Sequence, residues 1–82
     1  MRVVRIKCFD MSFNSSTWTQ REITQDFGLI YLDIVGWLIE ERKNCIIIAS
    51  EYQPSEKQFR HLQAIPRVCI QKVITLAEVK DV

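Results

Sequence analysis

Two apolar segments separated by one tight polar turn constrain this fold more than any other feature of the sequence. Residues 29–42 and 45–52 are rich in Ile, Val, Leu and aromatic side chains, which are enriched in β-strands. The polar residues Glu41–Asn44 lie between them, so the pair is predicted to form a β-hairpin. Gly36 within the first strand predicts a bulge or a sharp bend, which a small barrel needs in order to close.

Three further strands are predicted on either side of this hairpin. Residues 2–9 alternate apolar and basic side chains, the pattern of a half-buried strand, with Arg5 and Lys7 on its solvent face. Residues 58–65 and 70–76 are the other two strands. Pro66 ends the first of these because it has no N–H group to donate, and a single 3₁₀ turn is expected before the second.

The connections complete the predicted order of elements. Residues 10–28 form a long loop, in which Thr19 and Glu22 match a capping box and predict one helical turn over about residues 19–25. Residues 53–57 form a second tight turn, and residues 77–82 are expected to be a frayed tail. Eighty-two residues are enough for one domain. The expectation is an all-β, five-stranded SH3-like or Sm-like barrel over residues 1–82; the alternative is an open antiparallel sheet completed by a second subunit.

Charge and cysteine usage exclude several classes of protein. Eleven basic and ten acidic residues leave a net charge of +1, so a nucleic-acid ligand held by a broad basic face is not expected. The three cysteines are odd in number and form no CxxC pair, which favours free, buried thiols in a reducing cytoplasm over a disulfide framework or a metal site. Asp33 interrupts the longest apolar run, which is too short to span a membrane.

Enzymatic chemistry has little support in the sequence. The chain has a single histidine and lacks nucleophile, metalloprotease and phosphate-loop motifs, so no catalytic residue and no cofactor are expected. Asp33 within an apolar strand could be a carboxylate with a raised pKa, or could simply face solvent. We interpret the protein as a binding protein rather than an enzyme.

Short motifs along the chain resemble small hypothetical proteins encoded by tailed bacteriophages. The matching residues are Trp18, Val35–Leu38, Ile47–Ser50 and Ile65–Arg67. The resemblance implies a phage accessory protein acting in the cytoplasm of the host bacterium. Phage barrels of this size act mainly as binders: inhibitors of host enzymes, proteins that sequester nucleotide immune signals, or nucleic-acid adaptors.

Aromatic and basic residues near the predicted loops are the candidate binding residues. Trp18 in the first loop could stack on a planar ring, or could instead cover one end of the barrel. Around the second turn, an aromatic ring and two guanidinium groups could together bind a planar anion, although they could equally be ordinary surface residues. The candidates are Trp18, Tyr52, Arg60, His61 and Arg67.

Two functions are compatible with these residues and with the phage resemblance. The first is counter-defence by a homo-oligomer that sequesters a small anionic nucleotide signal at the edge between the first loop and the second turn. The second is inhibition of a host or defence enzyme through an exposed aromatic patch. Binding of nucleic acid in the manner of an Sm-like protein is the weaker alternative, because the net charge is only +1.

Overall fold

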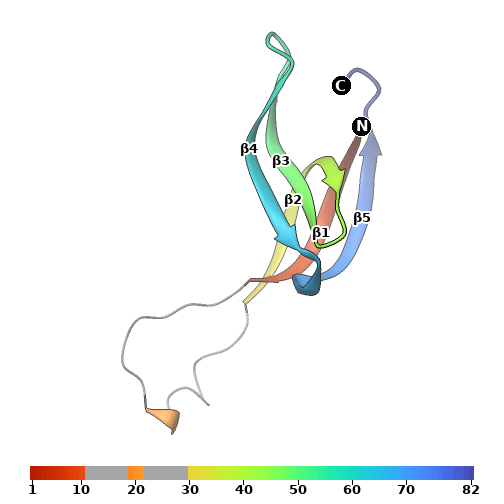
Figure 1. Ribbon diagram of the computed structural model, residues 1–82. Helices are drawn as coiled ribbons and strands as arrows, with labels where there is room; N and C mark the ends of the chain where they lie inside the picture. The colour runs from red at the N-terminus through yellow and green to blue at the C-terminus, as the bar shows by residue number, and fades with distance from the viewer. Residues whose placement is uncertain (11–18, 22–29) are drawn as a thin grey trace.

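The computed structural model describes residues 1–10, 19–21 and 30–82. Five antiparallel strands form one open sheet in the order β4-β3-β2-β1-β5, and a short 3₁₀ helix, η1, joins β4 to β5 (Figure 1). The five predicted strands and the 3₁₀ turn are confirmed, within two residues at each boundary. The elements are β1 (Arg2–Asp10), β2 (Ile30–Glu41), β3 (Cys45–Gln53), β4 (Gln58–Pro66), η1 (Arg67–Cys69) and β5 (Ile70–Glu78).

The C-terminal tail is more ordered than the sequence predicts. β5 continues to Glu78, and the backbone N–H of Val79 donates to the carbonyl of Met1 at 2.8 Å. The ammonium group of Met1 donates in turn to the carbonyl of Val79 at 2.8 Å and to Glu78 at 3.0 Å. The expectation of a frayed segment from residue 77 onward is therefore wrong as far as Val79, because β1 is long enough to pair with the whole of β5.

The predicted helical turn in the first loop is only partly described. Gln20 and Arg21 are helical, and residues 19–21 are exposed. The remainder of that turn lies outside the described residues.

The core occupies one face of the curved sheet. Alternation in β1 turns Val4, Ile6 and Cys8 inward, and these side chains are at most 2% exposed. Residues from all five strands pack around them, so a single small cluster joins the strands. Its other members are Leu38, Ile46, Ile48 and Ile65, with Leu32, Ile34, Ile70 and Val73 partly buried against it.

β2 bends in its middle, and this bend determines where the loops lie. A Cβ atom on Gly36 would lie 2.6 Å from the carbonyl oxygen of Ala49, so only glycine allows β2 and β3 to approach this closely. The pairing of β2 with β3 shifts between Leu38 and Glu40. The predicted bend at Gly36 is therefore confirmed as a close approach, with the register shift a few residues later.

Because of this bend, β2 pairs with its two neighbours through different halves. Residues 30–37 pair with β1, whereas the pairing with β3 begins only at Trp37. The β3–β4 hairpin consequently points away from the end of the sheet where β1 ends and β2 begins (Figure 1).

Cys45 and Cys69 are half-buried free thiols, and the thiol of Cys8 is buried in the core. No helix in the described part of the chain is long and apolar enough to cross a membrane.

Candidate functional site

Two of the sequence-predicted binding residues share one carboxylate on the β3–β4 hairpin. Nη2 of Arg60 lies 3.1 Å from Oε2 of Glu51, and Nε2 of His61 lies 3.3 Å from Oε1 of the same residue. All three side chains are at least half exposed. Glu51 therefore already offsets the positive charge that was expected to meet an anionic ligand.

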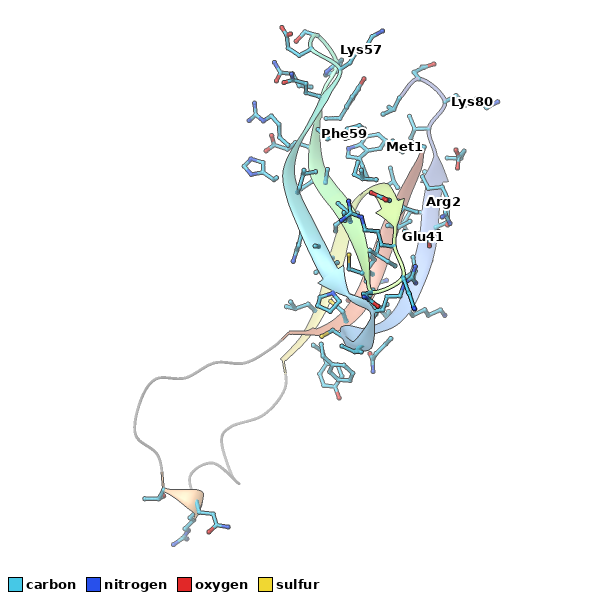
Figure 2. The ribbon with its side chains drawn as sticks, in the orientation of Figure 1. Met1, Arg2, Glu41, Lys57, Phe59 and Lys80 are labelled. Carbon is cyan, nitrogen blue, oxygen red and sulfur yellow. The ribbon has the colours of Figure 1, made fainter. Side chains whose placement is uncertain are left out.

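Tyr52 lies in an aromatic cluster formed by its own neighbours. Its ring centroid is 4.8 Å from that of Phe59, its partner across the hairpin, and 6.1 Å from that of Trp37. Figure 2 shows Phe59 below Lys57, which lies at the tip of the hairpin. All three rings are half-buried, so this cluster supports the hairpin next to its turn, and Tyr52 has only part of its surface left for a ligand. Trp37 belongs to this cluster and not to the central core.

Arg67 is separated from the other candidates. It lies seven residues beyond Arg60, about 20 Å along an extended strand. Its Nε donates to the carbonyl of Arg42 at 2.7 Å, and its backbone N–H donates to the carbonyl of Asn44 at 2.9 Å. These bonds fasten η1 to the β2–β3 turn, so Arg67 has a structural role there.

The predicted site required the first loop to meet the turn after β3. The loop leaves β1 at Asp10 and rejoins the sheet at Ile30, at the opposite end of the sheet from the Pro54–Lys57 turn (Figure 1). Trp18 itself lies outside the described residues. Among the described candidates, the structure brings Arg60 and His61 together at Glu51. Tyr52 belongs to the next cross-strand pair and so to the opposite face of the hairpin, and Arg67 lies apart.

A different cluster lies on the outer face of β1, β2 and β5, on the side opposite the core. Lys7 of β1 is paired directly with Lys72 of β5 and, on its other side, with Asp33 of β2. Directly opposite residues project from the same face of a sheet. Two ammonium groups and one carboxylate therefore form a row across three strands.

The carboxylate in this row, that of Asp33, is bound by the guanidinium group of Arg5. Its Nε donates to Oδ1 of Asp33 at 3.2 Å, and its Nη2 donates to Oδ2 at 2.8 Å. The hydrogen bond from Arg5 is the largest effect and lowers the pKa of Asp33; desolvation opposes it, and the charges of Arg5 and Lys7 lower the pKa further. Asp33 faces solvent, as one of the two sequence interpretations holds, and the alternative of a raised pKa is wrong because a guanidinium group binds both carboxylate oxygens.

An aromatic pair lies next to the lysines, two residues further along the strands. Phe9 is paired with Tyr31, and their ring centroids are 4.7 Å apart. Tyr31 is 68% exposed, so a large part of its ring is free to contact a ligand. A shallow hollow of about 220 Å³ lies beside the ring and includes Lys7, Asp33 and Gln71 in its lining. We call Lys7, Lys72, Phe9 and Tyr31 the lysine–tyrosine face.

Sequence reasoning finds only part of this face. Alternation in β1 places Arg5 and Lys7 on the solvent side, and the same alternation continued to Phe9, the last residue of the predicted strand, would have added that ring. Tyr31 and Lys72 join them only through the registers of β2 and β5 on β1. The register of β5 depends on shifts next to Val3 and Lys7, and the sequence gives no clear signal for these.

Comparison with known proteins adds no relative: no protein-family model, no curated protein and no solved structure matches this chain.

Proposed function

We propose that this protein is a non-enzymatic binding protein whose ligand combines a planar ring with a phosphate group, the chemistry of a nucleotide. The observation that carries this proposal is the direct pairing of Lys7 with Lys72 beside the exposed ring of Tyr31. Within the described residues, no ion pair joins either ammonium group to a carboxylate, since Asp33 is bound by Arg5. A phosphate placed between the lysines would supply the missing negative charge.

The arrangement has an energetic cost in the absence of a ligand. Like charges directly opposite each other on neighbouring strands destabilise a sheet, and salt screens that repulsion only in part. An anion bound by both lysines removes the repulsion and adds two charge-assisted hydrogen bonds. Stacking on an aromatic ring contributes further affinity for any planar base.

The fold and the phage resemblance suggest a biological setting for this function. The long first loop, the single 3₁₀ turn before β5 and the position of β1 between β2 and β5 support a small SH3-like or Sm-like barrel. In a bacterium infected by a phage, a homo-oligomer of such barrels would sequester a small anionic nucleotide signal and so act in counter-defence in the cytoplasm.

Titration with adenosine monophosphate, followed by two-dimensional NMR, tests the proposal. We expect the largest shifts at Lys7, Tyr31 and Lys72, with little change at Arg60 and Arg67. Inorganic phosphate should shift the signals of Lys7 and Lys72 but not those of Tyr31. Adenosine should bind more weakly than adenosine monophosphate. Shifts confined to the hairpin around Arg60 would instead favour the sequence-predicted site, and an absence of any shift would reject nucleotide binding.

A second candidate function is supported by a groove that carries two exposed apolar side chains. The groove, of about 330 Å³, opens between β2 and the β3–β4 hairpin, and its lining includes Val35 and Leu62. These two side chains are 53% and 63% exposed, and exposed apolar surface of this kind suits a protein partner.

Leu62→Asp should abolish inhibition of such a partner without altering nucleotide binding. Loss of both activities, or of neither, would argue against a separate protein site.

A further inference from the structure

The lysine–tyrosine face is open, and this openness restricts the form in which a nucleotide can bind. Sites for free small molecules usually enclose about 300–1,000 Å³ and bury about 70–90% of the ligand. The hollow beside Tyr31 is about 220 Å³, and the ring that would stack on the base is 68% exposed. A free nucleotide would therefore keep much of its surface in water, at the expense of affinity.

Resting on the proposed function, we infer that the ligand of this face is a segment of single-stranded nucleic acid. Proteins that bind single strands without sequence preference combine cationic side chains along the backbone with aromatic rings on which bases stack. They need no enclosing pocket, because the strand continues beyond each contact. The outer face of β1, β2 and β5 has both elements and is open at its surface.

The spacing of the face matches one nucleotide unit. Lys7 and Phe9 lie two residues apart on the same side of β1, a separation of about 7 Å. Tyr31 pairs with Phe9 on one side of β1, and Lys72 pairs with Lys7 on the other, so the Cα atom of Tyr31 lies about 8 Å from that of Lys7 and about 12 Å from that of Lys72. A base stacked on Tyr31 can therefore place an adjoining phosphate at the lysines.

Charge is concentrated on this face despite the balance of the whole chain. The face carries three positive side chains, Arg5, Lys7 and Lys72, and one negative side chain, Asp33. Its local net charge is therefore +2, whereas the net charge of the full sequence is only +1. The expectation that nucleic acid is not a ligand rests on the net charge of the whole chain. A nucleic-acid strand bound on this face would instead be attracted by the local charge of the face. With two lysines available, about two phosphates are neutralised.

Fluorescence anisotropy with a labelled oligothymidylate of about ten nucleotides tests this inference. Each neutralised phosphate of a single strand contributes about −0.7 to the slope of the logarithm of the association constant against the logarithm of the salt concentration. Two neutralised phosphates therefore predict a slope of about −1.4. Lys7→Gln and Lys72→Gln should each reduce the slope by about 0.7. Lys43→Gln and Lys57→Gln, at the two tight turns, are the matched controls and should leave the slope unchanged.

Substitution of the ring separates stacking from charge. Tyr31→Ala should weaken binding about tenfold without changing the salt slope, whereas Tyr31→Phe should restore most of the affinity because it retains the ring. Urea denaturation of each variant shows whether it remains folded. If Tyr31→Ala unfolds, the comparison of the two lysine variants with their controls still decides the question.

Oligouridylate and adenosine monophosphate are the comparison ligands. Binding of either oligonucleotide at least about tenfold more tightly than the mononucleotide, with the expected slopes, would support the inference. Tight binding of adenosine monophosphate that depends on Lys7 and Lys72, without binding of oligonucleotides, would overturn it and leave the proposed function intact. Failure of all three ligands at low salt would overturn both.

Discussion

Glycine at position 36 is required by a contact between two backbones. The carbonyl oxygen of Ala49 occupies the space that a Cβ atom on Gly36 would need, at 2.6 Å. A backbone atom on a paired strand cannot turn aside as a flexible side chain can. The sequence predicts a bend at this glycine, but it cannot identify the neighbour that the bend brings close.

Gly36→Ala should therefore destabilise the protein by about 1–3 kcal/mol, the usual cost of adding a methyl group to a closely packed site. The free energy of unfolding from urea denaturation measures the change. Ser50→Ala, at an exposed position on β3, is the control and should alter stability by less than about 0.5 kcal/mol. Equal stabilities of the two variants would mean that β2 and β3 separate easily at this point.

The Arg5–Asp33 pair predicts a pH dependence of stability. The hydrogen bond from Arg5 holds the pKa of Asp33 in the folded protein below its ordinary value of 3.8. A depressed folded pKa contributes stability above the unfolded pKa and loses it as the pH falls through the folded value. Asp33→Asn should thus differ most from the parent protein near neutral pH, and the difference should shrink below about pH 4.

Urea midpoints of both proteins between neutral and acidic pH measure this difference, and carboxyl NMR of Asp33 gives its pKa directly. Because both side chains are exposed, added salt should reduce the difference at neutral pH. A titration midpoint above the ordinary value would contradict the bidentate contact.

At the scale of the element, β4 departs from regular strand geometry at one residue. His61 has a φ of 58°, in the left-handed region that histidine, asparagine and aspartate adopt more readily than other residues with a side chain. The pairing of β4 with β3 is regular at Leu62 and at Arg60 but omits His61. The bend in β4 therefore lies at the point where Glu51 contacts both Arg60 and His61.

Two substitutions at this position should have opposite outcomes. His61→Val places a β-branched residue at positive φ and should cost about 1–2 kcal/mol, whereas His61→Asn should be nearly neutral because asparagine tolerates this conformation. Urea denaturation compares the two variants. Greater stability of the valine variant would show that β4 straightens without cost.

The elements themselves were largely predictable, whereas their placement was not. Alternation in β1 and the dense Ile and Val residues of β3 identify strands because burial on a sheet has a period of two residues. The direction of the β3–β4 hairpin follows instead from the contact of Gly36 with Ala49. The sequence-predicted site depended on that direction, and so its loop and its turn lie at opposite ends of the sheet.

At the scale of the whole molecule, the open sheet leaves apolar side chains on its edge elements. Leu62 on β4, Val68 on η1 and Leu76 on β5 are 63%, 93% and 51% exposed. Exposed apolar side chains next to unpaired strand edges favour association between chains. The core is small and supplies little net stability, which also favours association between chains.

Multi-angle light scattering at micromolar concentration should therefore give a mass above the 9.7 kDa of one chain. Leu62→Lys and Leu76→Lys should shift the mass toward the monomer, because lysine on an edge strand opposes pairing. Glu56→Lys is the control, since Glu56 is exposed in the turn between β3 and β4 and lies on no strand edge. A strict monomer for the parent protein would reject self-association.

The position of β1 between β2 and β5 determines the order in which the sheet can assemble. Hairpins such as β2–β3 need only a short turn to close, whereas the pairing of Cys8 with Ile70 must close a loop that spans most of the chain. The additional closure entropy amounts to about 2 kcal/mol. The meander from β2 to β4 can therefore form early, while β5 docks late against β1, so that this protein is expected to fold at the slow rate of domains rich in long-range strand pairs.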